Sequence, residues 1–269
     1  MFCMYVASSR RSASRKTRKC IRSFTTPSTE RTREQLRQLL RETAQSVAVV
    51  TTLLPPEGTN QSVAVPSGNA TQSAYHGATL SSFTSIAFDP YPLVAFSLRN
   101  PSRMAAALNF HVDRTQADTD TCTTPHMVIN ILSAVQPDLA VMFSRADLHS
   151  RPFQESHVQW TKSGEGFPII SDALGALSCA LISPSLPLGD LRWLPGCRSL
   201  LPNREEGVEL RPIEASGGST SELFIARVLR VERVPRVEGD KGEDEGLRTL
   251  PLLYHRRKYA TPSDIPPKS

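Results

Sequence analysis

Short apolar runs rich in β-branched residues recur along this chain, separated by turns that contain proline, serine and asparagine. The clearest of these runs occupy 46–53, 74–86, 93–98 and 127–132. Short helical patterns lie between them at 102–109 and 137–143, without the regular alternation of strand and helix that builds a parallel sheet. Proline (21) outnumbers glycine (14), which favours turns over a helical bundle. The pattern predicts a mainly β (α+β) domain whose antiparallel strands close, or nearly close, into a barrel.

The rest of the chain divides into weaker strands, one helix and aperiodic stretches. Strands are predicted at 173–182, 223–231 and 250–254. Leu36, Leu39 and Leu40 repeat at helical spacing and predict a helix from Glu30 to Gln45, within an N-terminal helical segment at 25–45. Aperiodic stretches are interpreted as insertions at 55–74, 185–221 and 235–248 and as a disordered tail at 261–269. The barrel domain is therefore placed at 46–260.

The positive charge of the chain is concentrated at its N-terminus. The net charge is +5, and residues 1–29 hold seven basic residues and no acid, which leaves 24 basic against 26 acidic residues in the remainder. A remainder of slightly negative charge argues against a nucleic-acid or membrane-surface protein. No segment approaches the ~20 apolar residues of a bilayer span.

The leader itself is rich in arginine and serine and free of acids, which is typical of a mitochondrial transit peptide. We therefore expect residues 1–24 to be a transit peptide, cleaved after Phe24, and the mature protein to lie in the mitochondrial matrix. The alternative is a basic tail with no targeting role.

Several common site types are excluded by the sequence. There is no GxGxxG after a strand, no GxxxxGK[ST], no GxSxG and no HExxH. The six histidines and five cysteines show no metal-ligand or paired spacing, so no metal site is expected. No catalytic acid, base or nucleophile can be identified from these patterns.

Three segments carry residues suited to binding a phosphorylated, aromatic ligand. In 77–85, hydroxyl groups at the end of a strand could donate to phosphate and ribityl oxygens, or could simply be a solvated edge. In 97–103, Asn100 as N-cap and Pro101 at the first helical position predict a helix start beside two arginines, which suits a phosphate dianion or is ordinary capping. In 143–145, Phe143 either belongs to the core or lies against a flat ligand.

These segments follow one another as in the flavin reductase-like family, which the chain resembles over most of its length. The resemblance rests on Gly-Ala-Thr-Leu-Ser-Ser-Phe from residue 77 and Asp-Pro-Tyr-Pro-Leu-Val from residue 89. It is extended by blocks at 47–52, 130–144 and 251–254. By this resemblance the fold is an FMN-binding split barrel that forms a homodimer, with FMN at or near the subunit interface.

The resemblance also assigns roles. Residues 79–82 would contact the isoalloxazine and ribityl chain, 97–98 the ring edge, 102–103 the phosphate, and 143–145 would close the pocket. The full set of predicted cofactor-binding residues is Thr79, Leu80, Ser81, Ser82, Ser85, Ser97, Leu98, Ser102, Arg103, Phe143, Ser144 and Arg145.

The implied reaction is hydride transfer from NADH or NADPH to flavin N5, which supplies reduced flavin to a flavin-dependent acceptor protein. One departure bears on it: family reductases commonly carry Gly-Asp-His before the late strand, and 219–222 here reads Ser-Thr-Ser-Glu. Either His255 or Tyr259 takes over the role of that histidine, or the reductant is not a nicotinamide. The alternative function is therefore an FMN-binding electron-transfer or flavin-carrier module without its own NAD(P)H turnover.

Overall fold

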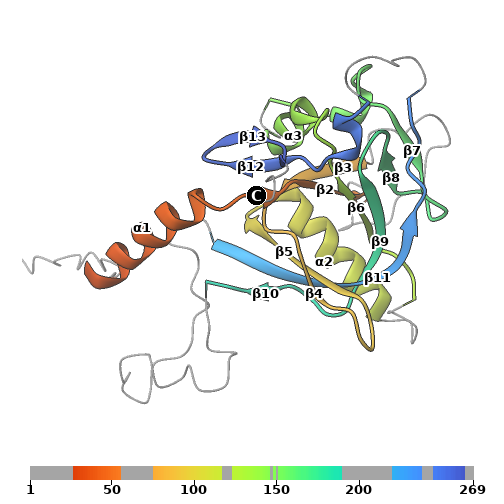
Figure 1. The fold of residues 1–269 in the computed structure, drawn as a ribbon. Coiled ribbons are helices and arrows are strands. Elements are labelled where there is room, and N and C mark those ends of the chain that lie inside the picture. Colours follow the sequence, from red (N-terminus) through yellow and green to blue (C-terminus); the bar gives the residue numbers. More distant parts are fainter. Residues whose placement is uncertain are drawn as a thin grey trace, which may run out of the picture. The chain divides into compact units, whose positions relative to one another are not determined.

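An antiparallel sheet that curls into a half-barrel forms the body of the protein (Figure 1). The computed structural model describes residues 27–55, 75–116, 123–145, 148–149, 151–189, 220–237 and 245–263. In spatial order the strands are β3 (Tyr75–Leu80), β2 (Ala48–Leu53), β6 (Met127–Ile131), β9 (Gly175–Leu181), β11 (Thr220–Glu232), β5 (Leu93–Asn100) and β4 (Thr84–Ala87), with β10 (Leu186–Pro187) paired to β11. The pairs in this sheet are all antiparallel, which confirms the predicted class.

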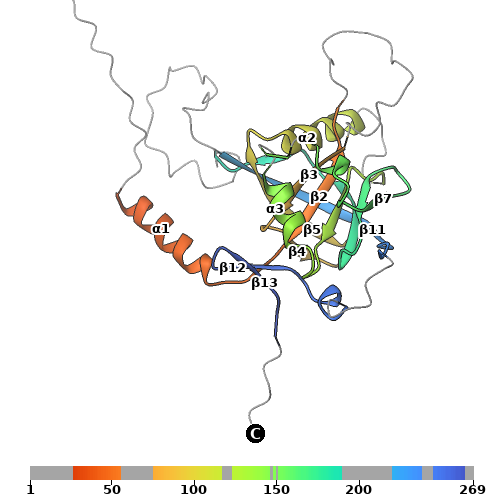
Figure 2. The ribbon, with the colours of Figure 1, turned by 90° about the horizontal axis from the view of Figure 1, so that it is seen from above.

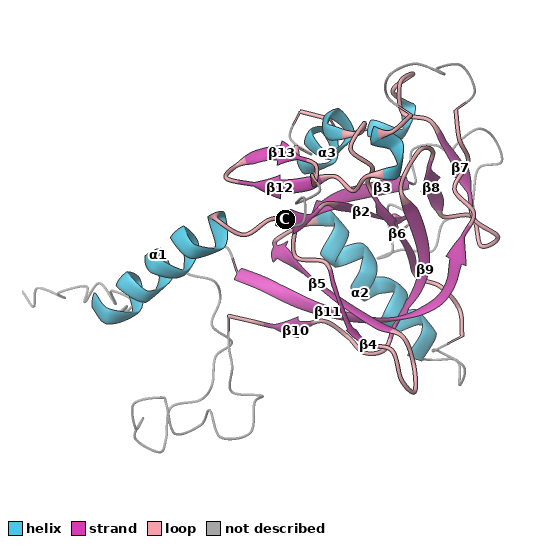
Figure 3. Ribbon diagram, in the orientation of Figure 1, coloured by secondary structure: helices cyan, strands magenta, loops and turns pink. Residues whose placement is uncertain are grey.

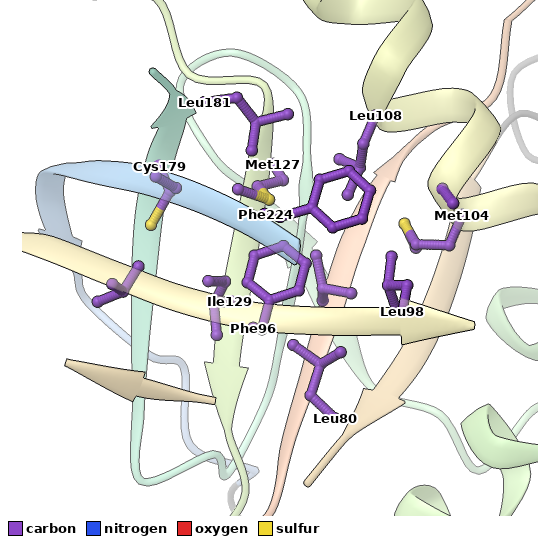
Figure 4. Close-up of a cluster of buried hydrophobic side chains, with 14 of the residues drawn as sticks. Leu80, Phe96, Leu98, Met104, Leu108, Met127, Ile129, Cys179, Leu181 and Phe224 are labelled. Carbon is purple, nitrogen blue, oxygen red and sulfur yellow. The ribbon is translucent and has the colours of Figure 1, made fainter. Parts of the chain in front are cut away.

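The curled sheet buries a different set of side chains on each face, because successive residues of a strand point to opposite sides. On the inner face, Phe96 and Phe224 stack with their ring centroids 5.3 Å apart. Helix α2 (Arg103–Gln116) covers this cluster with Met104 and Leu108 (Figure 4). On the outer face, α3 (Pro137–Ser144) packs Phe143 into a second cluster.

The barrel is split where β3 and β5 face each other. Strand β3 pairs with β2 along one edge, and β4 pairs only with the Leu93–Ala95 end of β5. No described strand pairs with the other edge of β3. On the side of β5 that β4 occupies, no described strand pairs with residues 96–100. Ser82 closes one end of the split, since its hydroxyl accepts a hydrogen bond from the Ser97 N–H (2.9 Å). The split therefore leaves backbone donors and acceptors of two strands available to a ligand.

The C-terminal segment returns to the sheet next to α3, as Figures 1 and 2 show from two sides. β12 (Leu253–His255) and β13 (Lys258–Ala260) form a hairpin, and β12 pairs with β1 (Gln45–Ser46). Upstream, η5 (Leu247–Thr249) is anchored by a 2.7 Å ion pair between Arg248 and Asp172. These contacts fix where the two tyrosines of the hairpin lie.

Several predicted boundaries were wrong. The first helix, α1 (Pro27–Arg41), ends before Gln45, because Gln45 and Ser46 pair with β12. The 74–86 run is two strands, β3 and β4, because the chain turns between them and crosses from the β2 edge to the β5 edge (Figure 3).

Helix α2 differs from its prediction at both ends. It continues to Gln116, so the loop expected at 113–126 begins later; Val112 is buried against the sheet and carries the helix beyond residue 109. The N-cap is Ser102, whose hydroxyl accepts from the Ala105 N–H at 3.0 Å, and not Asn100. Asn100 lies at the end of β5, and its amide donates to Glu222.

The predicted insertions are partly structured. Leu186, Pro187, Thr220 and Ser221 belong to β10 and β11, and η5 occupies the end of 235–248. Outside these stretches three strands were missed: β7 (Trp160–Lys162) and β8 (Pro168–Ile170), which form a separate short ladder, and β13 of the C-terminal hairpin. The leader at 1–24, nearly all of 55–74, the middle of 185–221 and most of the tail lie outside the described residues.

Helix α1, as far as Leu40, belongs to a different unit from the sheet domain, which begins at Arg41. Its apolar side chains are largely exposed, with relative accessibilities of 52% for Leu36, 65% for Leu39 and 45% for Leu40. Ion pairs one turn apart, such as Arg33 with Glu30 at 3.0 Å, support the helix. Within the part of the chain that the structure describes, no helix is both long and apolar enough for a bilayer span.

Candidate flavin site

The split between β3 and β5 holds a cavity of about 860 Å3. Its lining comes from β3 and the turn after it, from the end of β5, from the start of α2, from the end of α3 and from the C-terminal hairpin. The lining residues are Val47, His76, Gly77, Ala78, Thr79, Leu80, Ser81, Ser82, Ser97, Leu98, Arg99, Pro101, Ser102, Arg103, Met104, Phe143, Ser144, Ser221, Tyr254 and Tyr259. The volume lies in the range of pockets that hold small ligands and cofactors.

The lining includes every predicted cofactor-binding residue except Ser85 and Arg145. Ser85 lies beyond the turn, on β4, where it pairs with Val94. Arg145 is the C-cap of α3. Segments far apart in the sequence thus meet at one place, which their order along the chain alone could not establish.

The hydroxyl groups of the predicted set are not equivalent. Thr79 donates to the Ala140 carbonyl (2.7 Å) and Ser144 to the Val141 carbonyl (2.7 Å), so their protons are used within the protein. Ser82 is likewise engaged, since it donates to the Ser97 carbonyl at 3.2 Å. Ser81 and the Ser97 side chain make no hydrogen bond within the described chain. Their hydroxyls are therefore the ones available to donate to a ligand.

The start of α2 presents donors to the cavity. An α-helix leaves its first N–H groups without intrahelical acceptors. Here the Ala105 N–H bonds to the Ser102 hydroxyl (3.0 Å) and the Ala106 N–H to the Ser102 carbonyl (3.1 Å). This leaves the N–H groups of Arg103 and Met104, both lining residues, at the positive end of the helix.

Two arginines give this side of the cavity its charge. Arg99 and Arg103 both line it, and no described aspartate or glutamate pairs with either of them. The cavity lining contains no carboxylate. We call Arg99, Ser102 and Arg103 the cationic wall; its charge and its free N–H groups suit an anion such as a phosphate.

Another part of the lining is aromatic. Phe143 lies directly on Gly77, where a Cβ atom would come within 2.5 Å of the phenyl Cδ1, so only glycine allows this packing. The ring is 3% exposed and also packs on Phe153, which makes it a core residue that borders the cavity. Tyr254 and Tyr259 meet edge to face, with centroids 5.6 Å apart. We call Phe143, Tyr254 and Tyr259 the aromatic wall.

His76 is a lining residue that the sequence analysis did not select. It precedes Gly77 on β3 and is 5% exposed. Burial, and secondarily the Arg103 guanidinium, lower the pKa of His76 to about 4, so the ring is neutral near pH 7. One feature of the sequence could have indicated His76. It lies two residues before Ala78 and four before Leu80, so the three side chains point to the same face of the strand.

The stretch that stands in place of the family's Gly-Asp-His lies partly at the cavity. Ser221 lines the cavity and pairs across the sheet with Arg99, whereas Glu222 accepts hydrogen bonds from Asn109 (3.2 Å) and Ser185 (2.8 Å) outside it. Of the two expected substitutes for the family histidine, Tyr259 lines the cavity and His255 does not.

Comparison with known proteins agrees with this architecture. BorF, the flavin reductase component of a bacterial two-component tryptophan halogenase, superposes with a TM-score of 0.51 at 20% identity, covering 87% of this chain and 99% of its own. A nitrilotriacetate monooxygenase component B homologue from Mycobacterium thermoresistibile gives a TM-score of 0.51 at 20% identity, covering 89% and 93%. At such identity the likeness establishes the fold alone. A search of curated proteins gives no match.

The fold and the cavity define a split-barrel protein of the flavin reductase class. The sequence model described as "Flavin reductase like domain" matches residues 40–263. This chain therefore belongs to the flavin reductase-like family. Membership of this family indicates that the protein is an oxidoreductase.

Proposed function

We propose that this protein is an FMN-binding oxidoreductase that uses NADH or NADPH. The observation that carries the proposal is the pairing of a cationic wall and an aromatic wall across one cavity that contains no carboxylate. FMN has the matching parts, a phosphate at one end and a flat ring system at the other. Ser102, Arg103 and the free N–H groups of α2 would hold the phosphate, and the edges of β3 and β5 would face the ribityl chain and ring.

Bound FMN would supply the redox chemistry by accepting a hydride from a reduced nicotinamide. The residues of the chain would bind and orient the two ring systems. Phe143 and the tyrosine pair would exclude water from one side, and Ser81 and Ser97 would donate hydrogen bonds. No lining residue is a carboxylate, which agrees with a site that binds and orients the two ring systems.

Ser221 and Tyr259 bear on the choice of reductant. Ser221 lines the cavity in the stretch where family reductases commonly have a histidine. Tyr259 is the lining residue that would position the nicotinamide in place of that histidine. If these residues do not support nicotinamide binding, the protein is an electron-transfer or flavin-carrier module that is reduced by a partner.

An anaerobic absorbance experiment distinguishes the two functions. Residues 25–269 would be loaded with FMN and titrated with NADH, NADPH and finally dithionite. Bleaching of the flavin band at about 450 nm by a nicotinamide supports the reductase. A band that persists with both nucleotides and bleaches with dithionite supports the carrier, and the absence of any bound flavin would refute both.

We further propose that the protein is a homodimer of the mitochondrial matrix that supplies reduced flavin to an acceptor protein. Ile86 and Phe88, at the end of β4, are 49% and 74% exposed, and Tyr91 is 51% exposed, so this surface offers apolar area to a second copy. Light scattering would measure the mass of the assembly. Sequencing of the N-terminus of protein purified from mitochondria would test cleavage before Thr25, and an intact leader would contradict the cleavage.

A further inference from the structure

The ring of His76 opens on the cavity and makes no hydrogen bond within the described residues. The side chain is 5% exposed, and its nitrogens are not among the fully buried atoms that lack a partner. The ring lines the cavity together with Arg103. A ligand in the cavity would therefore meet an imidazole edge that the described residues leave free to donate or accept.

The charged surroundings of the ring identify the kind of ligand. On the α2 side the charged neighbour is Arg103, which acts on His76 electrostatically, and Arg99 at the end of β5 lines the same cavity. On the β2 side, the residue paired with His76 is the uncharged Thr52. The lining has no carboxylate that could stabilise a protonated imidazole. Only an anion that enters from the cavity would favour the charged form of this ring.

We propose that His76 is the specificity-determining residue for the phosphomonoester of FMN, which it binds together with Arg103 while it takes up one proton from solvent. This inference rests on the proposed flavin site. The phosphate would compensate the Arg103 charge, and the second ring nitrogen would become a donor as the imidazole is protonated. In this step one N–H bond forms on the imidazole and one bond to hydrogen breaks in the buffer acid or hydronium ion that supplies the proton.

The charge of the ligand explains the selectivity. A phosphomonoester carries about −1.5 to −2 charges at pH 7, because its second pKa is near 6. The phosphates of FAD are diesters of the pyrophosphate, with one charge each, and riboflavin has none. His76 therefore contributes most to FMN, less to FAD and nothing to riboflavin.

Calorimetry and flavin fluorescence on the whole protein test this inference. Binding of FMN, FAD and riboflavin would be measured at pH 7 in two buffers of different ionisation enthalpy, which gives the number of protons exchanged. FMN should bind with uptake of about one proton, and riboflavin with none. His76→Gln should weaken FMN about tenfold and abolish the uptake, leaving riboflavin affinity within about twofold. The exposed His157, varied as His157→Gln, is the matched control.

The outcomes separate the two proposals. Binding of FMN and riboflavin with equal proton exchange overturns the role of His76 and leaves the flavin site intact. Failure of all three flavins to bind overturns the flavin site itself. Thermal melting establishes whether His76→Gln is folded; if it is not, the comparison of FMN with riboflavin on the unmodified protein decides the question.

Discussion

The two walls of the cavity are built in different ways. The cationic wall consists of a helix start and a strand end, and Arg99 and Arg103 at its surface are exposed. On the aromatic wall, Phe143 is part of the core, since it is 3% exposed and packed between Gly77 and Phe153. The cationic wall can therefore change its charge without loss of the fold, whereas the aromatic wall cannot change its shape freely at Phe143. Affinity for the phosphate and affinity for the ring should respond separately to mutation.

Reversal of charge at Arg103 should have the largest effect. Arg103→Glu removes a charge-assisted hydrogen bond and adds a repulsion, together about 3–4 kcal/mol, or several hundredfold in FMN affinity. Riboflavin, which has no phosphate, should bind as before. Fluorescence titration of both flavins measures this, with the exposed Arg233→Glu as the control. An equal loss for riboflavin would place the phosphate elsewhere.

Acid should destabilise the protein through two buried histidines, one of them at the cationic wall. Burial is the main cause that lowers the pKa of His76 and of His126 to about 4 in the folded state. The unfolded chain binds these protons near pH 6.5, so stability is complete above pH 6.5 and is lost as pH falls toward 4, by at most about 3 kcal/mol for each ring.

Thermal melts between pH 7 and pH 4 would measure this loss. FMN should reduce the part of the acid-induced loss of stability that comes from His76, because that ring becomes protonated in the folded complex. It should not reduce the share of His126, which is 2% exposed and accepts from the Leu181 N–H at 3.0 Å, away from the cavity lining. Melting temperatures that do not change over this pH range would contradict the neutral, buried state of both histidines.

The close contact beneath the aromatic wall predicts a loss of stability of intermediate size. In Gly77→Ala the new methyl group would lie 2.5 Å from Phe143 Cδ1, so the ring, which is 3% exposed, would have to shift from its packed position. We expect a loss of about 2 kcal/mol in the free energy of unfolding, measured by chemical denaturation. Gly175→Ala is the control, because nothing lies within 4 Å of its added Cβ. Equal stability of the two variants would mean that Phe143 adapts.

The sequence identified the segments of the site but not how their side chains are used. The resemblance assigned Ser81, Ser97 and Arg103 to one site, and in the structure all three line the same cavity. The sequence could not show that the Thr79 hydroxyl donates to the carbonyl of Ala140, 61 residues further on, because such partners are set by tertiary packing. His76 was missed for the same reason: its role depends on the proximity of Arg103 and on burial, neither of which follows from the spacing of the two residues.

Some residues in the sequence blocks that carry the family resemblance stabilise the fold and do not line the cavity. Asn130 is fully buried, accepts from the Ile170 N–H (2.9 Å) and donates to the Val49 carbonyl (3.3 Å). Gln136 donates to the Ser171 carbonyl at 2.8 Å. Neither residue lines the cavity. Both join strands and loops of the barrel, so that part of the resemblance reflects the fold and not the ligand.

The smallest predicted effect tests the exposed part of the aromatic wall. Tyr254 is 37% exposed and contacts Tyr259 edge to face. Tyr254→Leu keeps the apolar volume but removes the aromatic contact, which is worth about 1 kcal/mol, so FMN and riboflavin should both bind about fivefold more weakly. Phe110→Leu on α2 is the control, because Phe110 also makes an edge-to-face contact, with His111, and does not line the cavity. A loss confined to FMN would show that Tyr254 contacts the phosphate end, and the assignment of the two walls to ring and phosphate would then have to be reversed.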